Sequence, residues 1–486
     1  MPSQPNTTAP DAKNGHPEGP VVSRIEKTRS SSADSDALRL EQMGHAQELD
    51  RSFSLPAMCG LCLCLMATWE ALSTVVAAAL TNGGAPCLFY NYILSFCCTI
   101  AITCSLGEIA SMYPTAGGQY YWVAALSPVS SRKFSSFFTG WTSLGAQIVF
   151  TASAAFAAGI IHIAAFVAVL VTLGVMAPKN SASFVFTEFT NNSGWPSDGV
   201  SWLVGLLSVV YPFLGYDAVC HMSEEIPHPE RNVPIAMVGS VVINGLLGLV
   251  YGIVLLFSIG SLDSLLTTPT GFPYMQIYLD VTASPAGSTV MSLTLTIIAI
   301  TATVAGIAST SRTAWALARD RAIPFDRYFS KVSDRLRVPI RAILLVLILQ
   351  ILLGFIYLGN TTAFNAVLSM AIIAMYLSYL APIVCMLFNE RRSYGANDYG
   401  YWTLGKPLGI TLNIISIVWM TVAIVFSTFP TVMPVTAQNM NYSIVVMTGW
   451  FLFGGVYYFV SARKKFDIPV VNVSGITALS VAVDGA

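Results

Sequence analysis

The chain has 486 residues, of which 54% are hydrophobic and only 10% are charged, and its mean hydropathy is +0.65. Soluble domains carry about 25% charged residues, so this composition excludes a soluble protein and predicts an all-α, polytopic membrane protein. The formal net charge is −1 and no basic run is interleaved with aromatic residues, which excludes nucleic acid as a partner.

The chain divides by composition into a polar tail, a long apolar region and a second tail. Residues 1–51 hold few large apolar groups and cannot bury a core, so we predict a disordered tail there. The membrane domain covers 52–461, and 462–486 form the C-terminal tail. Runs of about 20 apolar residues indicate spans, which we place near 53–80, 88–106, 137–177, 200–220, 235–259, 288–311, 339–358, 363–388, 408–430 and 441–461.

Two of these runs are broken near the middle. The run 53–80 is interrupted at residues 68–70, and the run 200–219 is interrupted at Pro212 and again at 215–217. Lipid offers no hydrogen-bond partner to unwound backbone, so such breaks persist only where protein or a watery cavity covers them. A pair of broken spans at corresponding positions in two halves of a chain indicates the binding site of a transporter.

Basic residues predict the orientation of the spans. They gather in 312–341, in 389–406 and at 463–465, and counting crossings places all three segments on one side of the membrane. That side is the cytoplasm by the positive-inside rule, and both termini are predicted to lie there. The opposite loops carry three glycosylation sequons, which begin at Asn191, Asn360 and Asn441.

The run 137–177 fits no simple count of crossings. As one helix its roughly 41 residues would be about 60 Å long, twice the thickness of the hydrocarbon core. Arg132 and Lys133 place its start inside, and Asn191 places the next loop outside, which requires an odd number of crossings. We therefore expect two partial spans joined within this run.

Three motifs carry a resemblance to a known family. Residues 106–122 read LGEIASMYPTAGGQYYW, residues 213–225 read FLGYDAVCHMSEE, and residues 311–320 read SRTAWALARD. The first resembles the signature after the second helix of amino acid permeases. The other two resemble the sixth helix and the end of the eighth helix of the fungal amino acid/choline branch. This branch includes GABA and choline permeases and belongs to the amino acid–polyamine–organocation superfamily.

The resemblance implies a LeuT-like fold of twelve helices, in which helices one to five and six to ten form inverted repeats. This chain departs from that pattern, because after Ala158 it passes directly to Ile161 and a segment that looks like late helix five. At about 20 residues per span, roughly 50–70 residues are absent, covering helix four and parts of helices three and five. We therefore expect 10–11 spans and an incomplete first repeat.

The candidate substrate-binding residues lie at the two breaks. A broken helix exposes N–H groups that bind carboxylates and C=O groups that bind cations. Glu70 is a candidate counterion for a substrate amine, or a candidate proton carrier. Alternatively, it forms a structural pair with a residue of another helix and has no role in transport. Asp217 lines the site, locks the unwound segment or caps the half-helix that follows. The full set is Thr68, Trp69, Glu70, Ala71, Phe213, Gly215, Tyr216 and Asp217. The aromatic residues in this set either line the substrate site, where they would stack on a quaternary ammonium, or serve only in packing.

A second set is predicted to form a gating or structural element at the cytoplasmic ends of the helices. It comprises Glu108, Gly117, Gly118, Glu224, Glu225 and Arg312. We expect Glu224 and Glu225 to form solvated pairs with Arg312 or Arg319. His162, in the anomalous run, is expected to be satisfied or water-facing rather than a proton relay.

The sequence therefore predicts a secondary active transporter that moves an amino acid, GABA or a choline-like amine by alternating access together with a co-transported proton. The alternative is a non-transporting membrane sensor or an inactive truncated permease.

No HExxH, GxSxG or P-loop pattern occurs, so neither an enzyme nor direct ATP drive is expected. The nine cysteines lie in or beside apolar runs, so we expect no metal site, and no cofactor is expected. We place the protein in the bilayer of the plasma membrane, or of the vacuole.

Overall fold

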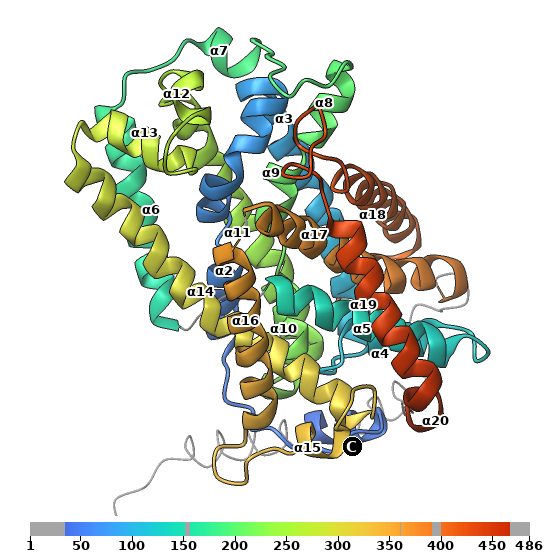
Figure 1. The fold of residues 1–486 in the computed structure, drawn as a ribbon. Helices are drawn as coiled ribbons and strands as arrows, with labels where there is room; N and C mark the ends of the chain where they lie inside the picture. The colour runs from blue at the N-terminus through green and yellow to red at the C-terminus, as the bar shows by residue number, and fades with distance from the viewer. Residues whose placement is uncertain (1–34, 151–155, 360, 391–399, 467–486) are drawn as a thin grey trace, which may run out of the picture.

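The computed structural model describes residues 35–150, 156–359, 361–390 and 400–466 (Figure 1). All regular structure in these residues is helical, which confirms the all-α fold class. The helices of the first half are α2 (Leu55–Met66), α3 (Thr68–Met112), α4 (Gln119–Leu126), α5 (Arg132–Phe150), α6 (Phe156–Met176), α7 (Ala182–Phe186), α8 (Asp198–Val204), α9 (Leu207–Val210), η1 (Tyr211–Phe213), α10 (Ala218–His221) and η2 (Ser223–Glu225).

The second half continues with long helices joined by short ones. These are α11 (Pro229–Phe257), α12 (Leu262–Leu266), α13 (Pro273–Thr282), α14 (Pro285–Arg319), α15 (Asp326–Phe329), α16 (Ile340–Gly359), α17 (Thr361–Cys385), η3 (Met386–Glu390), α18 (Lys406–Phe426), α19 (Ser443–Tyr457), η4 (Tyr458–Ala462) and α20 (Arg463–Lys465). Helix α17 packs against α4, α5, α18 and α19, and α11 packs along α3, so the two halves share one core.

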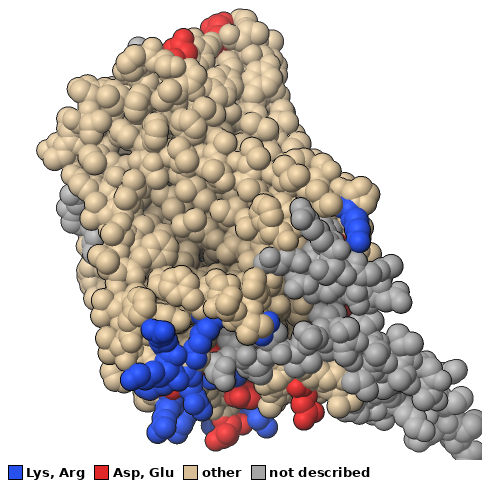
Figure 2. All heavy atoms as spheres, turned by 90° about the vertical axis from the view of Figure 1, so that its right-hand side faces the viewer, with Lys and Arg blue, Asp and Glu red and all other residues tan. Residues whose placement is uncertain are grey.

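The described helices account for the predicted spans. Seven segments are long and apolar enough to cross a membrane, and two shorter apolar helices lie within α6 and α16. The first segment, Leu55–Met112, holds two crossings, because Gly83 and Gly84 leave helical geometry in its middle. Most of the middle and upper surface in Figure 2 is free of charged side chains, as a lipid-facing band requires.

Lys and Arg gather at the lower end of the molecule in Figure 2. We call this the arginine-rich end and define it by the loop from α14 to α16, where Arg321, Arg327, Arg335 and Arg337 are exposed. The segment with Asn191 lies at the opposite end, beside the loop after α18: the N–H of Met433 donates to the carbonyl of Ser193 (2.6 Å). The charge asymmetry read from the sequence is therefore an asymmetry of the folded molecule.

The run 137–177 forms two helices, α5 and α6. In Figure 1, α5 lies low, beside α4 and α10, whereas α6 rises along the left side toward α7. The two helices thus lie at different heights and together make one passage between the ends of the molecule. This arrangement reconciles the length of the run with the odd parity of its crossings.

The N-terminal segment 35–52 is ordered, which corrects the disorder predicted for that part of 1–51. Residues 35–42 are helical, and Leu40, Met43 and Leu49 are buried in the core. The composition is polar, but these three apolar side chains are buried in the hydrophobic core. Residues 1–34 lie outside the described part of the chain.

Candidate substrate site between two broken helices

The first break is a single left-handed residue. Helix α2 ends where Ala67 adopts φ 40° and ψ 47°, and α3 starts at Thr68. The prediction placed the break at residues 68–70, but Thr68 to Ala71 form the first turn of α3, so this boundary is corrected. Alanine tolerates the left-handed region better than the β-branched Thr68 or the bulky Trp69, which explains why the break falls at Ala67.

The second break lies where the sequence predicts it. Pro212 belongs to the short 3₁₀ turn η1, Leu214 is extended, and Gly215 has φ 97°, which glycine adopts without steric cost. Helix α10 then starts at Ala218. The chain therefore runs without helical structure from Leu214 to Asp217 through the buried interior.

The two breaks contact each other. The hydroxyl of Thr68 donates to the carbonyl of Pro212 at 2.8 Å, and both residues are buried. The thiol of Cys62, in α2, lies 3.6 Å from the carbonyl of Tyr216. Side chains of one broken helix thus take up backbone carbonyls that the other break leaves without helical partners.

Glu70 lies in the first turn of α3 and is only 5% exposed. Its Oε1 is 2.6 Å from Nδ1 of His162, in α6, and the pair is buried. Sequence analysis missed this partner and expected a satisfied or water-facing histidine. The signal available was the position of His162 in the anomalous run, since that run brings α6 against α2.

Aromatic rings pack around Trp69, the residue next to Glu70. The Trp69 ring centroid lies 5.2 Å from that of Tyr251 in α11, 5.8 Å from that of Phe166 in α6 and 6.1 Å from that of His162. The other two predicted aromatics lie elsewhere: Phe213 stacks on Phe96 (5.7 Å), and Tyr216 packs on Tyr379 (5.2 Å).

Asp217 ties three helices to the unwound segment. Its Oδ1 accepts from the hydroxyl of Tyr379 (2.7 Å) in α17, and its Oδ2 accepts from Nε2 of Gln119 (2.9 Å) in α4. His221 Nε2 lies 3.3 Å from the same oxygen. The side chain makes no capping hydrogen bond to α10. Its contacts fix the unwound segment, and it also lines the cavity beside it.

Little space remains between the breaks. A cavity of about 10 Å³ is lined by Leu65, Gly215, Asp217, Ser309 and Met375, among others, which is room for one water molecule at most. A larger cavity, of about 420 Å³, lies between α13 and α14, and no predicted site residue lines it. The two breaks therefore pack closely against each other in this structure.

The acids at the arginine-rich end are paired, but not in solvent as predicted. Arg319 contacts both carboxylate oxygens of Glu224 at 3.0 and 3.2 Å, and Arg312 contacts both of Glu225 at 2.7 and 3.1 Å. Glu224, Glu225 and Arg312 are 1%, 3% and 5% exposed. The expectation of solvated pairs is therefore wrong, because 35–52 cover this end. Burial raises the pKa of Glu224, but Arg319 outweighs it and holds that pKa below its ordinary value.

The glycine turn of the first motif packs beneath the second break. Gly118 has φ 53°, and a Cβ there would lie 2.7 Å from Cε1 of His221. The adjacent N–H of Ala116 donates to Oε1 of Glu224 (3.1 Å). Gly117 packs against the Tyr120 ring, and Glu108 accepts from the N–H of Leu404 (2.8 Å). These residues connect the helix ends rather than line the cavity.

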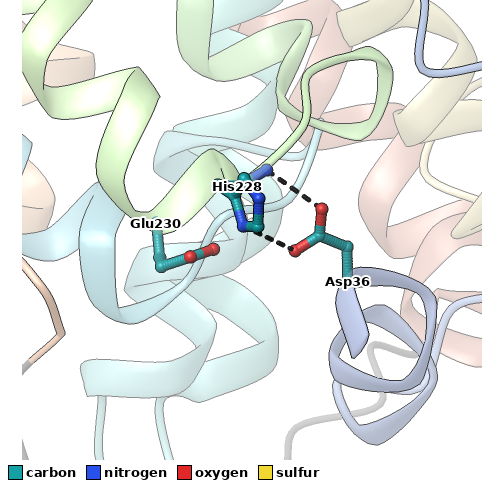
Figure 3. A group of neighbouring side chains, drawn as sticks. All are labelled: Asp36, His228 and Glu230. Carbon is teal, nitrogen blue, oxygen red and sulfur yellow. Dashed lines mark hydrogen bonds and ion pairs between the residues drawn. The ribbon is translucent and has the colours of Figure 1, made fainter. Parts of the chain in front are cut away.

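The N-terminal segment is attached by charges (Figure 3). Asp36 accepts from the N–H of His228 (2.9 Å), and Glu230 follows two residues later. One ligand atom from each of these three residues lies within 4.8 Å of the others, a spacing that suits a metal ion. Arg51 is 3.5 Å from Asp36 and Arg39 is 3.8 Å from Glu230, however. Both carboxylates therefore have an arginine partner, and the cluster serves as an ionic latch.

Two of the glycosylation candidates lie at the end opposite the arginines. The amide nitrogen of Asn191 donates to the carbonyl of Trp195 (3.0 Å), and that of Asn441 donates to the carbonyl of Ser427 (2.7 Å). Asn360 lies outside the described residues.

Comparison with known proteins agrees with a membrane permease. The sequence model of the amino acid permease family matches residues 145–451. A choline transporter of Saccharomyces cerevisiae is 29% identical over 470 residues, covering 86% of this chain and 83% of the transporter. An uncharacterized amino-acid permease of Schizosaccharomyces pombe is 31% identical over 507 residues, covering 93% and 92%. A manganese transporter structure from Eremococcus coleocola covers 84% of this chain and 95% of its own, with 11% identity and a TM-score of 0.49.

The fold and the two facing breaks define a multi-pass membrane permease. The family match spans more than half of the 486 residues. The chain belongs to the amino acid permease family, which confirms the resemblance read from its three motifs.

The alignments also bear on the missing region. The match to the S. pombe permease runs over 507 positions but uses 93% of this 486-residue chain, so about 55 positions of the relative have no counterpart here. At about 20 residues per span, that is the size of the predicted gap in helices three to five. Its location after Ala158 stays a prediction.

Proposed function

We propose that this chain is a secondary active transporter that moves a small organic amine, such as an amino acid, GABA or choline, across a membrane by alternating access coupled to a proton. The named relatives are a choline transporter and amino-acid permeases. The charge asymmetry between the two ends of the molecule supports cytoplasmic termini, and we place the protein in the plasma membrane or the vacuolar membrane.

The observation that carries the proposal is the hydrogen bond from Thr68 to Pro212. It joins two helix breaks that are 144 residues apart in sequence, and a buried carboxylate, Glu70, lies two residues from the contact. Unwound backbone and a buried acid are both costly in a membrane and mark a solute site by default. An integral membrane protein without a solute would gain stability from two continuous helices instead.

Alternating access needs a second element that can close one end. The buried pairs Glu224–Arg319 and Glu225–Arg312 tie η2 to α14 at the arginine-rich end. Asp217 ties the unwound segment to α4 and α17. We infer that these contacts hold that end shut and must loosen for the solute to leave there.

Uptake tests the proposal directly. The full chain would be expressed in cells lacking their own permeases, and uptake of radiolabelled choline, GABA and a panel of amino acids would be measured, then repeated in proteoliposomes. We expect saturable uptake of at least one amine that collapses when the proton gradient is dissipated. A correctly inserted chain that moves none of them supports the alternative, a sensor or an inactive permease.

A matched pair of variants locates the site. Glu70→Gln removes one charge with little change in shape, and we expect it to abolish uptake while expression is retained. Glu188→Gln makes the same change at an exposed residue of the loop after α7 and is expected to leave uptake at the wild-type rate. Equal uptake by both variants would remove Glu70 from the mechanism.

A further inference from the structure

The loop that defines the arginine-rich end holds more basic than acidic charge. Residues 321–341 contain six basic side chains and two carboxylates, which gives the segment a formal charge of +4. In the described part of the chain, no carboxylate lies within ion-pair distance of any of the six. Arg312 and Arg319 of α14 are paired with acids, so only the charge of the loop is left for a partner outside the chain. The six are Arg321, Arg327, Lys331, Arg335, Arg337 and Arg341.

Large apolar side chains are exposed between these charges. Phe325, Tyr328 and Leu336 are 77%, 54% and 60% exposed. The guanidinium of Arg341 lies 4.3 Å from the centre of the Tyr328 ring and donates to the carbonyl of the same residue (3.2 Å). Aromatic rings and basic side chains occur together at the level of lipid head groups, where one part meets hydrocarbon and the other meets phosphate. The loop therefore has the chemistry of a membrane interface rather than that of a segment surrounded by water.

The backbone holds the loop in a defined and costly conformation. Six non-glycine residues of the described chain have positive φ, and three of them lie here: Arg321 (62°), Phe325 (57°) and Arg337 (50°). Side chains other than those of Asn and Asp adopt this region at a steric cost, which proteins retain mainly at functional positions. The indole nitrogen of Trp315, in α14, also donates to the carbonyl of Ser330 (3.0 Å) and fixes the loop to the helix before it. The charged surface is thus preorganised.

The loop lies beside the surface that faces lipid. Leu344 and Ile348 of α16 are half exposed, and Arg341 precedes Leu344 by three residues, about 5 Å along the helix axis. In Figure 2 the Lys and Arg side chains border the uncharged band. A charge at this distance lies within the Debye length of the head groups, about 8 Å at physiological salt, so salt does not fully screen its attraction to an anionic leaflet.

We propose that residues 321–341 bind the anionic phospholipid head groups of the leaflet that they face, with Phe325, Tyr328 and Leu336 inserted among these head groups. The inference goes beyond the proposed function, because it does not depend on which solute the chain moves. Each Lys or Arg near an anionic leaflet strengthens binding about fivefold. Guanidinium groups, which make up five of the six cations, bind phosphate oxygens through two parallel hydrogen bonds.

A lipid titration tests the proposal. Purified full-length protein in a neutral detergent would be titrated with phosphatidylserine and, separately, with phosphatidylcholine, each with a fluorescent acyl chain, and binding would be read by energy transfer from the tryptophans. We expect phosphatidylserine to bind about tenfold more tightly or better at low salt. That preference should largely disappear in about 0.5 M NaCl, since the charges are exposed. Equal binding of the two lipids by the wild type, or a preference that salt does not reduce, would refute the proposal without any variant.

Glycerophosphoserine separates a lipid surface from a site for free phosphate groups. It carries the same head group without acyl chains, so at equal concentration it should not displace the bound phosphatidylserine. If it displaces the lipid fully, the loop recognises a soluble phosphate compound and the proposed membrane contact is wrong.

Two triple variants remove the same number of charges from different places. Changing Arg327, Arg335 and Arg337 together to Gln should weaken phosphatidylserine binding about tenfold or more and leave phosphatidylcholine binding unchanged. Changing the exposed Arg463, Lys464 and Lys465 of α20 to Gln should keep the preference for phosphatidylserine. If both variants lose it equally, the total charge of the protein rather than this loop holds the lipid, and the assignment to residues 321–341 fails.

Phe325→Asn tests the inserted ring without a penalty to the fold, because Asn tolerates positive φ better than Phe. We expect this variant to bind both lipids several-fold more weakly while its preference for phosphatidylserine stays. Unchanged affinity for both lipids would show that Phe325 does not enter the head-group layer.

Discussion

Two sets of buried acids differ in how completely their partners satisfy them. At the arginine-rich end, Glu224 and Glu225 each have a guanidinium on both oxygens. At the first helix break, Glu70 has one imidazole on one oxygen and nothing on the other among the described residues. A buried acid with a bidentate partner fixes an arrangement, whereas a half-satisfied one is available for a ligand. We read the first set as a lock and Glu70 as part of a site.

The largest expected effect comes from breaking the lock. Arg312→Ala leaves Glu225 buried without its partner, which typically costs about 3–5 kcal/mol. We therefore expect a marked loss of thermal stability of the purified protein in detergent. The double variant Arg312→Ala, Glu225→Ala removes both charges and should recover part of that loss. If the single and double variants melt together, the pair is not a buried, mutually dependent unit.

The next effect is steric. Gly118→Ala places a methyl group 2.7 Å from His221 at a residue with φ 53°, and strain of this kind costs about 1–3 kcal/mol. Gly174→Ala is the matched control, since a Cβ there meets nothing within 4 Å. Thermal melting should separate the two variants. Equal melting temperatures would show that the glycine turn does not press on α10.

The sequence predicted the second break better than the first, and the reason is physical. Pro212 lacks an N–H and Gly215 adopts positive φ without steric cost, so the residue types themselves predict the second break. Ala67 is an ordinary helix former, and only its surroundings hold it in the left-handed region. The pair with His162 was likewise not predicted, because it depends on how α6 packs against α2.

The sequence also predicted the acid–arginine pairs only in part. The prediction that Glu224 and Glu225 pair with Arg312 or Arg319 followed from the ends of two helices. The choice of arginine by each acid, and the burial of both pairs, did not. That burial depends on residues 35–52, where Gln47 donates to the carbonyl of Glu224 (2.8 Å) and Arg51 to that of Ile226 (2.7 Å). A polar composition predicts disorder, yet a few directed hydrogen bonds and three apolar side chains suffice to order the segment.

A smaller effect follows from pH at that segment. Burial, and after it the charge of Arg319, lower the pKa of His45 to about 3 from 6.5. A lowered pKa means that the released segment binds the proton more tightly. Docking is therefore at full strength above pH 6.5 and weakens as pH falls from 6.5 toward 3, by about 1.4 kcal/mol per unit.

Limited proteolysis of residues 35–52 in detergent measures this weakening, and cleavage should accelerate as pH falls from 7 to 5. His45→Leu removes the titrating group and keeps the bulk, so its cleavage rate should change less over the same range. An equal acceleration in the variant would assign the pH dependence to other groups.

The smallest effect on stability is expected at Glu70, although its effect on transport is the largest. Glu70→Gln keeps an acceptor for a neutral His162, so the change should cost no more than about 1 kcal/mol, the worth of one ordinary hydrogen bond. Melting of Glu70→Gln beside Arg312→Ala, both in detergent at neutral pH, compares the two sets of acids directly. A site residue should leave the fold intact and abolish uptake, whereas a lock residue should lower the melting temperature first. If Glu70→Gln melts as early as Arg312→Ala, Glu70 belongs with the structural acids, and the distinction between lock and site fails.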